Sequence, residues 1–173
     1  DLGVFDTYTE GVAVKARLCA LVGILPSAGD ESNPGGYFIN GADGAAIVNS
    51  RVSGAWASLV RAAQSYGVVL RASSSFRTMQ HQTDLCNQNA GCRNGDYTEV
   101  AKPGNSSHQA GVAIDFSLTG GNDAKSNRTC SNRDTRPDTQ YQWLRSNASR
   151  FGFKQYANEA WHFDALNTDN RCL

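Results

Sequence analysis

The sequence has no net charge, no long apolar run and few of the features that mark nucleic-acid or membrane binding. Sixteen basic residues balance sixteen acidic ones, so no overall field would hold nucleic acid or an anionic membrane. No run approaches the roughly 18 apolar residues of a membrane-spanning helix. Asp1 does not begin a signal peptide, so we expect a mature or trimmed chain. Because 40% of the 173 residues are hydrophobic, we expect residues 1–173 to form one globular domain and a monomer.

Methionine occurs once, and the five cysteines have no Cys-x-x-Cys spacing. A zinc knuckle is therefore disfavoured, and the cysteines instead indicate an oxidising compartment. Cys86 and Cys92 are close enough in sequence to close a small loop, for which we predict a disulfide. Cys19 lies in an apolar run and is expected to be a buried, unpaired thiol. Cys130 and Cys172 lie in polar stretches and could tie down the C-terminal tail.

In residues 106–118, a polar loop changes into a strand. Apolar residues alternate with small or polar ones from residue 112 onward, so Asp115 is predicted to point away from the apolar face. His108 lies seven residues upstream, where the loop can bring its imidazole over Asp115. The pair forms half of a predicted metal site.

The other half is predicted in residues 158–164. Alternation places His162 on the polar side of a short strand, and pairing of the two strands would bring it to Asp115. Imidazole and carboxylate ligands suit zinc, and three protein ligands leave one position for water. Glu159 precedes His162 by three residues, so a bend must turn it towards the metal, where it could take a proton from water.

These residues carry a family resemblance. Ser-x-His-x-x-Gly-x-Ala-x-Asp from Ser106 to Asp115, followed by Glu-x-Trp-His from Glu159 to His162, resembles the VanY-type zinc D-alanyl-D-alanine carboxypeptidases. Lysostaphin-type peptidases and Hedgehog signalling domains are relatives of that family. The resemblance implies one zinc ion per chain, held by His108, Asp115 and His162, with Glu159 as the catalytic base.

The resemblance extends upstream to residues 73–82, which look like the family's Ser-Gly-Tyr-Arg-Ser segment with a Gln five residues after the Arg. By this resemblance Arg77, Gln82 and Ser106 line the substrate cleft. Arg77 would grip a terminal carboxylate or stabilise the oxyanion, and the other two would donate or accept hydrogen bonds. The family's usual Gly, Tyr and Ser are replaced here by Ser75, Phe76 and Thr78. The likeness makes residues 51–165 the catalytic core and leaves residues 1–50 poorly matched.

Helices are predicted on either side of the first family segment. Apolar residues recur at helical spacing over residues 51–66 and Gly67 follows them, which predicts a helix with one buried stripe that includes Tyr66. Residues 68–70 are predicted to form a short strand, which leads to a strand-to-helix turn. Thr78 or a nearby residue is expected to cap the helix that carries Gln82.

The remaining segments are less distinctive. Residues 139–151 are predicted to be the last helix, ended by Gly152, with a return strand over residues 153–156. Residues 11–18 give a weak strand pattern. Two stretches are interpreted as polar loops, the first with at most a short strand at residues 37–39: residues 26–44 and 119–138.

The fold class expected is α+β, with helices packed on one side of a small, largely antiparallel sheet. The resemblance places the zinc cleft on the sheet's other face.

Three further side chains receive weaker interpretations. His81 is not expected to be a ligand, Asp164 could hold the imidazole of His162, and Trp161 is expected in the core rather than as a substrate platform.

Two classes of function fit these motifs. The resemblance implies a zinc peptidase that cleaves peptidoglycan stem peptides, either as a D,D-carboxypeptidase or as a lysin-like endopeptidase of the L-alanyl-D-glutamate or D,D type. The alternative is a non-catalytic zinc-binding module, as Hedgehog domains illustrate, but such a module does not need the base Glu159. A glycan on the sequon at Asn105 would obstruct the loop before His108. We therefore expect a secreted or cell-envelope protein of a bacterium, or a phage lysin.

Overall fold

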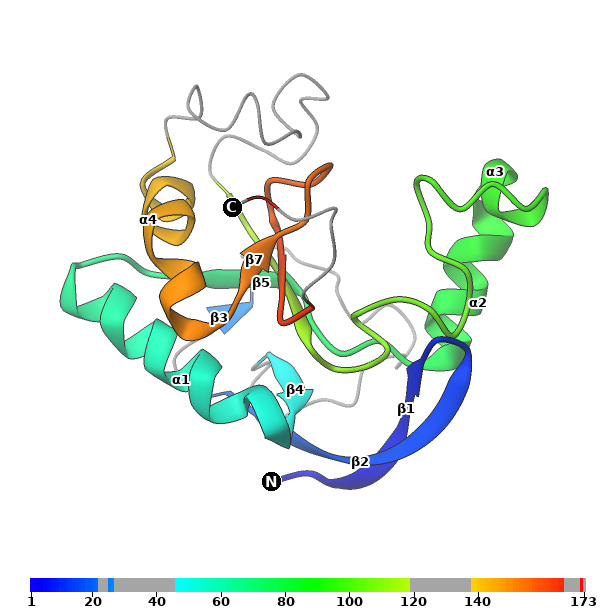
Figure 1. Ribbon diagram of the computed structural model, residues 1–173, viewed down its shortest axis with the longest axis horizontal. Helices are drawn as coiled ribbons and strands as arrows, with labels where there is room; N and C mark the ends of the chain where they lie inside the picture. Colours follow the sequence, from blue (N-terminus) through cyan, green and yellow to red (C-terminus); the bar gives the residue numbers. More distant parts are fainter. Residues whose placement is uncertain (22–24, 27–45, 119–137, 167–171, 173) are drawn as a thin grey trace.

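The computed structural model describes residues 1–21, 25–26, 46–118, 138–166 and 172, and within them it has the predicted α+β fold (Figure 1). A five-stranded sheet carries the strands in the order β3-β5-β6-β8-β7. Its neighbours pair antiparallel, except for β3 and β5, which are parallel. The bounds are β3 (Leu25–Pro26), β5 (Arg71–Ser74), β6 (Ala113–Phe116), β7 (Lys154–Gln155) and β8 (His162–Asp164).

A second, three-stranded sheet was not expected from the sequence. It contains β1 (Gly3–Thr9), β2 (Val12–Ala20) and β4 (Ile47–Asn49), all antiparallel. β1 and β2 form a hairpin whose two turn residues, Glu10 and Gly11, have φ values of 50° and 80°, as tight hairpin turns require. The strand predicted over residues 11–18 is confirmed as β2, whereas β1 was missed.

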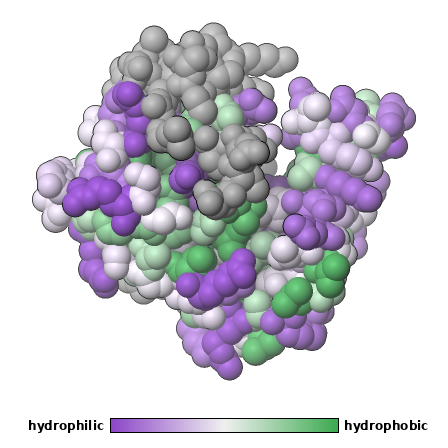
Figure 2. Space-filling view, in the orientation of Figure 1, coloured by the Kyte–Doolittle hydropathy of each residue, from purple (hydrophilic) through white to green (hydrophobic). Residues whose placement is uncertain are grey.

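Only part of the helical structure covers the five-stranded sheet. Helix α1 (Ser50–Ser65) and helix α4 (Thr139–Asn147), with its 3₁₀ extension η4 (Ala148–Phe151), pack against one face. Helices α2 (Met79–Gln88) and α3 (Ala90–Arg93) instead form a separate lobe (Figures 1 and 2). The expected arrangement, with helices on one side of a small and largely antiparallel sheet, is confirmed by α1 and α4, while α2 and α3 stand apart from that layer.

The core lies between α1, α4 and the sheet. The ring of Trp56 on α1 stacks on Phe153 with centroids 3.5 Å apart and meets the edge of Phe116 at 5.9 Å. Each buried aromatic side chain contributes about 1.5–3 kcal/mol through the apolar surface it removes from water. The predicted apolar face of the central strand is confirmed, since Ile114 and Phe116 belong to this core.

Several predicted boundaries shift in the structure. Pairing of the strand after α1 begins at Arg71 rather than at residues 68–70, where Val68 and Leu70 are buried in the core ahead of the ladder and Val69 is exposed. Tyr66 caps the end of α1 and is 74% exposed, so it does not belong to the buried stripe. The last helix ends as predicted at Gly152, which has a φ of 86°. Asp138 is buried at the start of α4 rather than solvated.

The cysteines follow most of the predictions. Cys86 on α2 and Cys92 on α3 form the expected disulfide. Cys19 is a free thiol, although half-buried rather than fully buried. Cys172 is disulfide-bonded, whereas Cys130 lies outside the described residues. Residues 37–39 and 119–137, for which a short strand and a polar loop were predicted, also lie outside them. None of the helices in the described part of the chain has the length and apolarity of a membrane span.

Candidate metal centre and cleft

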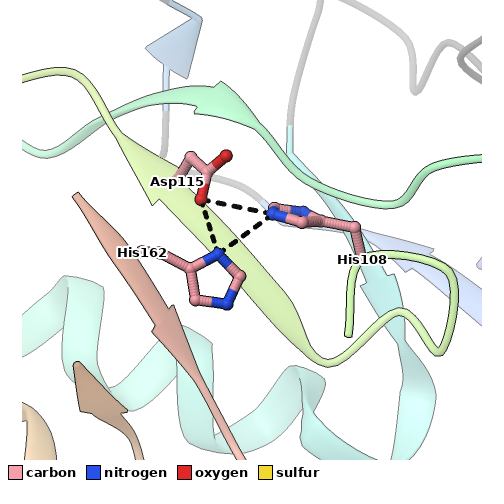
Figure 3. A group of neighbouring side chains, drawn as sticks. All are labelled: His108, Asp115 and His162. Atoms are coloured by element: carbon pink, nitrogen blue, oxygen red, sulfur yellow. Dashed lines mark hydrogen bonds and ion pairs between the residues drawn. The ribbon is translucent and has the colours of Figure 1, made fainter. Parts of the chain in front are cut away.

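The strands β6 and β8 are neighbours in the sheet, and their register places Asp115 opposite His162, as the sequence predicted. The loop before β6 adds His108 to the pair (Figure 3). The Asp115 Oδ1 atom lies 2.9 Å from His162 Nδ1 and 3.2 Å from His108 Nε2. The two imidazole nitrogens are 3.2 Å apart, so three potential ligand atoms converge on one point.

The His108 side chain is held in the orientation that a metal ligand needs. It is 3% exposed, and its Nδ1 atom lies 2.7 Å from the backbone carbonyl oxygen of Ser75. A carbonyl only accepts, so Nδ1 carries the proton and donates it. The lone pair of Nε2 therefore points to the cluster.

His162 is oriented in the same way from the other side. Its Nε2 atom lies 3.0 Å from Asp164 Oδ2 and 3.1 Å from Ser107 Oγ. Asp164 has no exposed surface, and its carboxylate accepts the Nε2 proton. This contact leaves Nδ1 to face Asp115 and His108, an arrangement that raises the basicity of a metal-binding imidazole.

The three side chains also tune one another electrostatically. Burial lowers the pKa of His108 despite the nearby carboxylate, which favours the neutral imidazole. Burial opposes ionisation of Asp115, but the charges and hydrogen bonds of both histidines outweigh it and hold the pKa of Asp115 below its usual range. Burial likewise opposes a charged His162, yet hydrogen bonds to Asp115 and Asp164 outweigh it and raise the pKa of His162 to about 9. A cation at this point would have to displace that proton.

Glu159 reaches the cluster through the bend that the sequence required. It lies in a turn between β7 and β8, where its backbone N–H donates to Tyr156 and its carbonyl accepts from His162, each at 3.2 Å. The Glu159 Oε2 atom is 3.7 Å from His162 Nδ1. Its carboxylate therefore lies beside the ligand atoms without belonging to the converging group.

Arg77 supplies a positive charge to the same region. It follows β5 and precedes α2, whose first turn Thr78 caps as predicted. Nη1 donates to Gln82 Oε1 at 2.8 Å and Nη2 to Ser74 Oγ at 3.3 Å. Burial lowers the pKa of Arg77 and the carboxylates of Asp115 and Glu159 act against that shift, so the guanidinium remains charged.

Gln82 and Ser106 both line the cleft, but their polar atoms have internal partners. The fully buried Gln82 accepts from Arg77 and donates from Nε2 to the Ala101 carbonyl at 2.7 Å. Ser106 Oγ accepts from the His108 N–H at 3.3 Å. Both residues therefore position other groups of the site, and their contact with substrate stays a prediction.

The converging atoms open into a cleft of about 390 Å³. Its lining includes residues 97–101, which follow the α2–α3 lobe, together with Tyr156 and Trp161. Trp161 also packs against the core, so it has the expected structural role and faces the cleft as well. Sequence reasoning missed Tyr156 and Ser107, and Ser107 occupies a free position of the family motif where no pattern singles it out.

This combination of an α+β fold, a His-Asp-His cluster and an adjacent glutamate in a cleft defines a metallopeptidase. Residues 45–166 match the sequence profile of the VanY family, described as D-alanyl-D-alanine carboxypeptidase. The chain belongs to this family, which confirms the resemblance inferred from the motifs. None of the curated protein sequences matches the chain significantly.

Solved structures of peptidoglycan enzymes share the fold. A point mutant of the vancomycin-resistance D,D-pentapeptidase VanY, in complex with Zn(II), aligns with a TM-score of 0.55 at 24% identity, over 78% of this chain and 82% of that one. VanYB in complex with D-alanine-D-alanine gives 0.54 at 24% identity, over 78% and 81%. The LD-carboxypeptidase LdcB gives 0.62 at 20% identity, over 94% and 73%.

Proposed function

We propose that this protein is a zinc-dependent D-alanyl-D-alanine carboxypeptidase that removes the last residue of peptidoglycan stem peptides. The observation that carries the proposal is the convergence of His108 Nε2, Asp115 Oδ1 and His162 Nδ1 in an open cleft. Family membership supports the reaction class. The VanY structures bound to Zn(II) and to D-alanine-D-alanine support the same ion and ligand class here.

The residues of the cluster fit one zinc ion per chain. Two neutral imidazoles and one carboxylate are a donor set that zinc accepts, and three protein ligands leave a position for water or substrate. Both imidazoles are fixed through their second nitrogens, His108 by Ser75 and His162 by Asp164. A bound zinc ion would supply a Lewis acid that polarises the scissile carbonyl and lowers the pKa of a water molecule.

Glu159 is proposed as the general base and then the general acid. Its carboxylate takes a proton from the attacking water while the water oxygen forms a bond to the carbonyl carbon. The same carboxyl group then gives that proton to the leaving amine, and the carbon–nitrogen bond breaks. The 3.7 Å separation of Glu159 Oε2 from His162 Nδ1 supports this role.

Arg77 is proposed to recognise the chain end that a carboxypeptidase must bind. A substrate carboxylate that enters a partly dry cleft loses hydration, and this loss is costly unless the carboxylate meets a cation and donors. Gln82 and Ser74 hold the Arg77 guanidinium in place. Ser106 and Gln82 are proposed to contribute hydrogen bonds, through reorganisation of the internal contacts they make.

Residues 1–173 are proposed to act as one domain and as a monomer in an oxidising environment, either secreted or in the envelope of a bacterium, or as part of a phage lysin. The Cys86–Cys92 disulfide supports this environment. Peptidoglycan stem peptides are the proposed partner.

Digestion of purified muropeptides with different stem lengths tests the proposal. We expect loss of one D-alanine from pentapeptide stems, measured by mass spectrometry, and no loss after the metal is removed. Larger fragments would indicate an endopeptidase. Trimming of tetrapeptide stems alone would indicate an L,D-carboxypeptidase, the activity named for the LdcB enzyme. Zinc binding without cleavage of any stem would indicate a binding module.

A further inference from the structure

The segment that carries His108 has no regular structure of its own. Residues 102–112 form a succession of turns between the α2–α3 lobe and β6. A metal ligand on such a segment needs support from outside, because a loop alone leaves its side chains several accessible positions. Part of the support comes from Arg77, whose N–H donates to the His108 carbonyl at 3.1 Å.

The β1–β2 hairpin gives further support at two points on either side of His108. The Gly11 N–H donates to the Gly104 carbonyl at 2.9 Å, and the Tyr8 N–H donates to the Gln109 carbonyl at 3.0 Å. The hairpin, residues 3–20, lies outside the part of the chain that matches the family profile. It nevertheless binds the backbone of the loop four residues before the ligand and one residue after it.

The side chain of Gln109 connects the two points. It has no exposed surface, and its Oε1 atom accepts from the Gly104 N–H at 2.7 Å. Gly104 and Gln109 are thus bonded to each other, and each is bonded to the hairpin. These three hydrogen bonds and the hairpin backbone from Tyr8 to Gly11 close a ring, and His108 directly precedes its member Gln109.

The contact between the two glycines leaves no room for a side chain. Gly104 has a φ of 93°, and a Cβ atom there would lie 2.9 Å from the Gly11 Cα. The obstructing atom is backbone, so the hairpin itself would have to move. Gly95 offers a matched comparison, because its φ is 85° and a Cβ atom there would meet nothing within 4 Å.

The hairpin also packs against Phe76, the residue before Arg77. A second apolar cluster joins Leu18 of β2, Ile47 of β4 and Phe76, with Phe5 of β1 packed against it. Phe76 is 1% exposed and precedes Arg77, and its N–H donates to the Ile47 carbonyl at 2.9 Å. Residues on both sides of the cleft therefore depend on the first sheet.

We propose that the β1–β2 hairpin is a positioning element of the metal centre, which clamps the loop of His108 through Gly104 and Gln109. This inference rests on the proposed function, in that His108 is taken as a zinc ligand. The hairpin itself contributes none of the converging ligand atoms and none of the residues that line the cleft. Its role is to hold His108 Nε2 where the other two ligand atoms converge.

Zinc affinity in the full chain tests the proposal, measured by competition with a chelating indicator. Gly104→Ala should weaken zinc binding about tenfold or more, the usual effect of losing a contact that orients a ligand. Gly95→Ala, which has the same backbone strain without the clash, should bind zinc like the parent. Equal affinity of Gly104→Ala and Gly95→Ala would overturn the role of the hairpin, whereas a parent protein that binds no zinc would instead overturn the proposed function.

Hydrogen exchange in the parent protein keeps the proposal testable if Gly104→Ala fails to fold. Coupling between two sites is reciprocal, so zinc binding should slow exchange of the Tyr8 and Gly11 amides. The Leu2 amide, which donates to Leu18 within the same sheet, should be unaffected. If zinc leaves the Tyr8 and Gly11 amides unchanged, the hairpin does not position the ligand loop.

Discussion

Asp164 and His162 lie two residues apart on β8, and the carboxylate of Asp164 accepts the Nε2 proton of His162 at 3.0 Å. A carboxylate with no exposed surface is costly unless it is paired. The pair fixes which imidazole nitrogen faces the other two ligands. Asp164 therefore sets the metal-binding geometry, although it does not reach the metal position itself.

Replacing Asp164 with asparagine tests this relationship. The amide keeps the shape of the side chain, but its neutral oxygen accepts a weaker hydrogen bond from His162 Nε2 than the carboxylate does. Zinc affinity should therefore fall by about 10- to 100-fold. Isothermal titration of zinc into the metal-free protein measures the change. Asp6→Asn is the control, since Asp6 is exposed and pairs only with the still more exposed Lys15 among the ion pairs described. Unchanged affinity in Asp164→Asn would contradict the assignment.

Glu159→Gln should retain the fold and one equivalent of zinc while turnover falls by about 10²- to 10⁴-fold. The amide can hold a water molecule but cannot accept its proton. Metal analysis and D-alanine release on the same preparation separate the two effects. Glu99→Gln serves as the control because Glu99 lines the same cleft, exposed and away from the cluster. Near-parental turnover in Glu159→Gln would refute its role as the base.

Gln82→Leu should lower the free energy of unfolding by about 1–3 kcal/mol, because it leaves the Ala101 carbonyl and an Arg77 N–H without their partner. The value of kcat/KM should fall as well, since Arg77 loses its anchor. Gln80→Leu on the same helix is the control. Gln80 is exposed, and such substitutions usually change stability by less than about 0.5 kcal/mol. Equal urea midpoints for the two variants would show that Gln82 is not an anchor.

His81 predicts a pH dependence of stability. Burial and the positive charge of Arg77 lower the pKa of His81 to about 4, although Asp84 acts in the opposite direction. In the unfolded chain its pKa is about 6.5, so between these values the unfolded state binds more protons. Stability is therefore lost as the pH falls through this window. With a chelator present to exclude metal, the Tm of His81→Gln should drop less between pH 7 and pH 4 than the Tm of the parent. An identical drop in the two proteins would contradict the lowered pKa of His81.

The parts of the site that could be predicted lie on strands with clear alternation. The apolar pattern around Asp115 fixes which face its side chain occupies, and the pattern around His162 does the same, so their pairing followed from the sequence. Alternation alone would have turned Glu159 away, so its position required a bend before His162, and the structure has a turn there. These relationships depend on local periodicity and short loops, which a sequence displays directly.

The parts that could not be predicted depend on contacts between distant segments. Strand β1 gives no clear apolar alternation, because its one buried residue, Thr7, is polar. Apolar side chains gather on the surface over the hairpin (Figure 2), where Val4, Val12 and Val14 are exposed. The contact of Gly11 with Gly104 leaves no pattern in either segment. The internal hydrogen bonds of Gln82 are equally invisible, because a buried glutamine and a substrate-binding one look the same in a sequence.

The most direct test of the proposed carboxypeptidase compares pentapeptide stems with a free or an amidated terminal carboxylate. A charge-assisted hydrogen bond from Arg77, worth about 1.5–3 kcal/mol, would change the rate by roughly one to two powers of ten if it is lost in the transition state. We therefore expect release of a single D-alanine from the free stem and a rate lower by that factor for the amidated stem. Equal rates for the two stems, or fragments larger than one residue, would contradict recognition of the chain end.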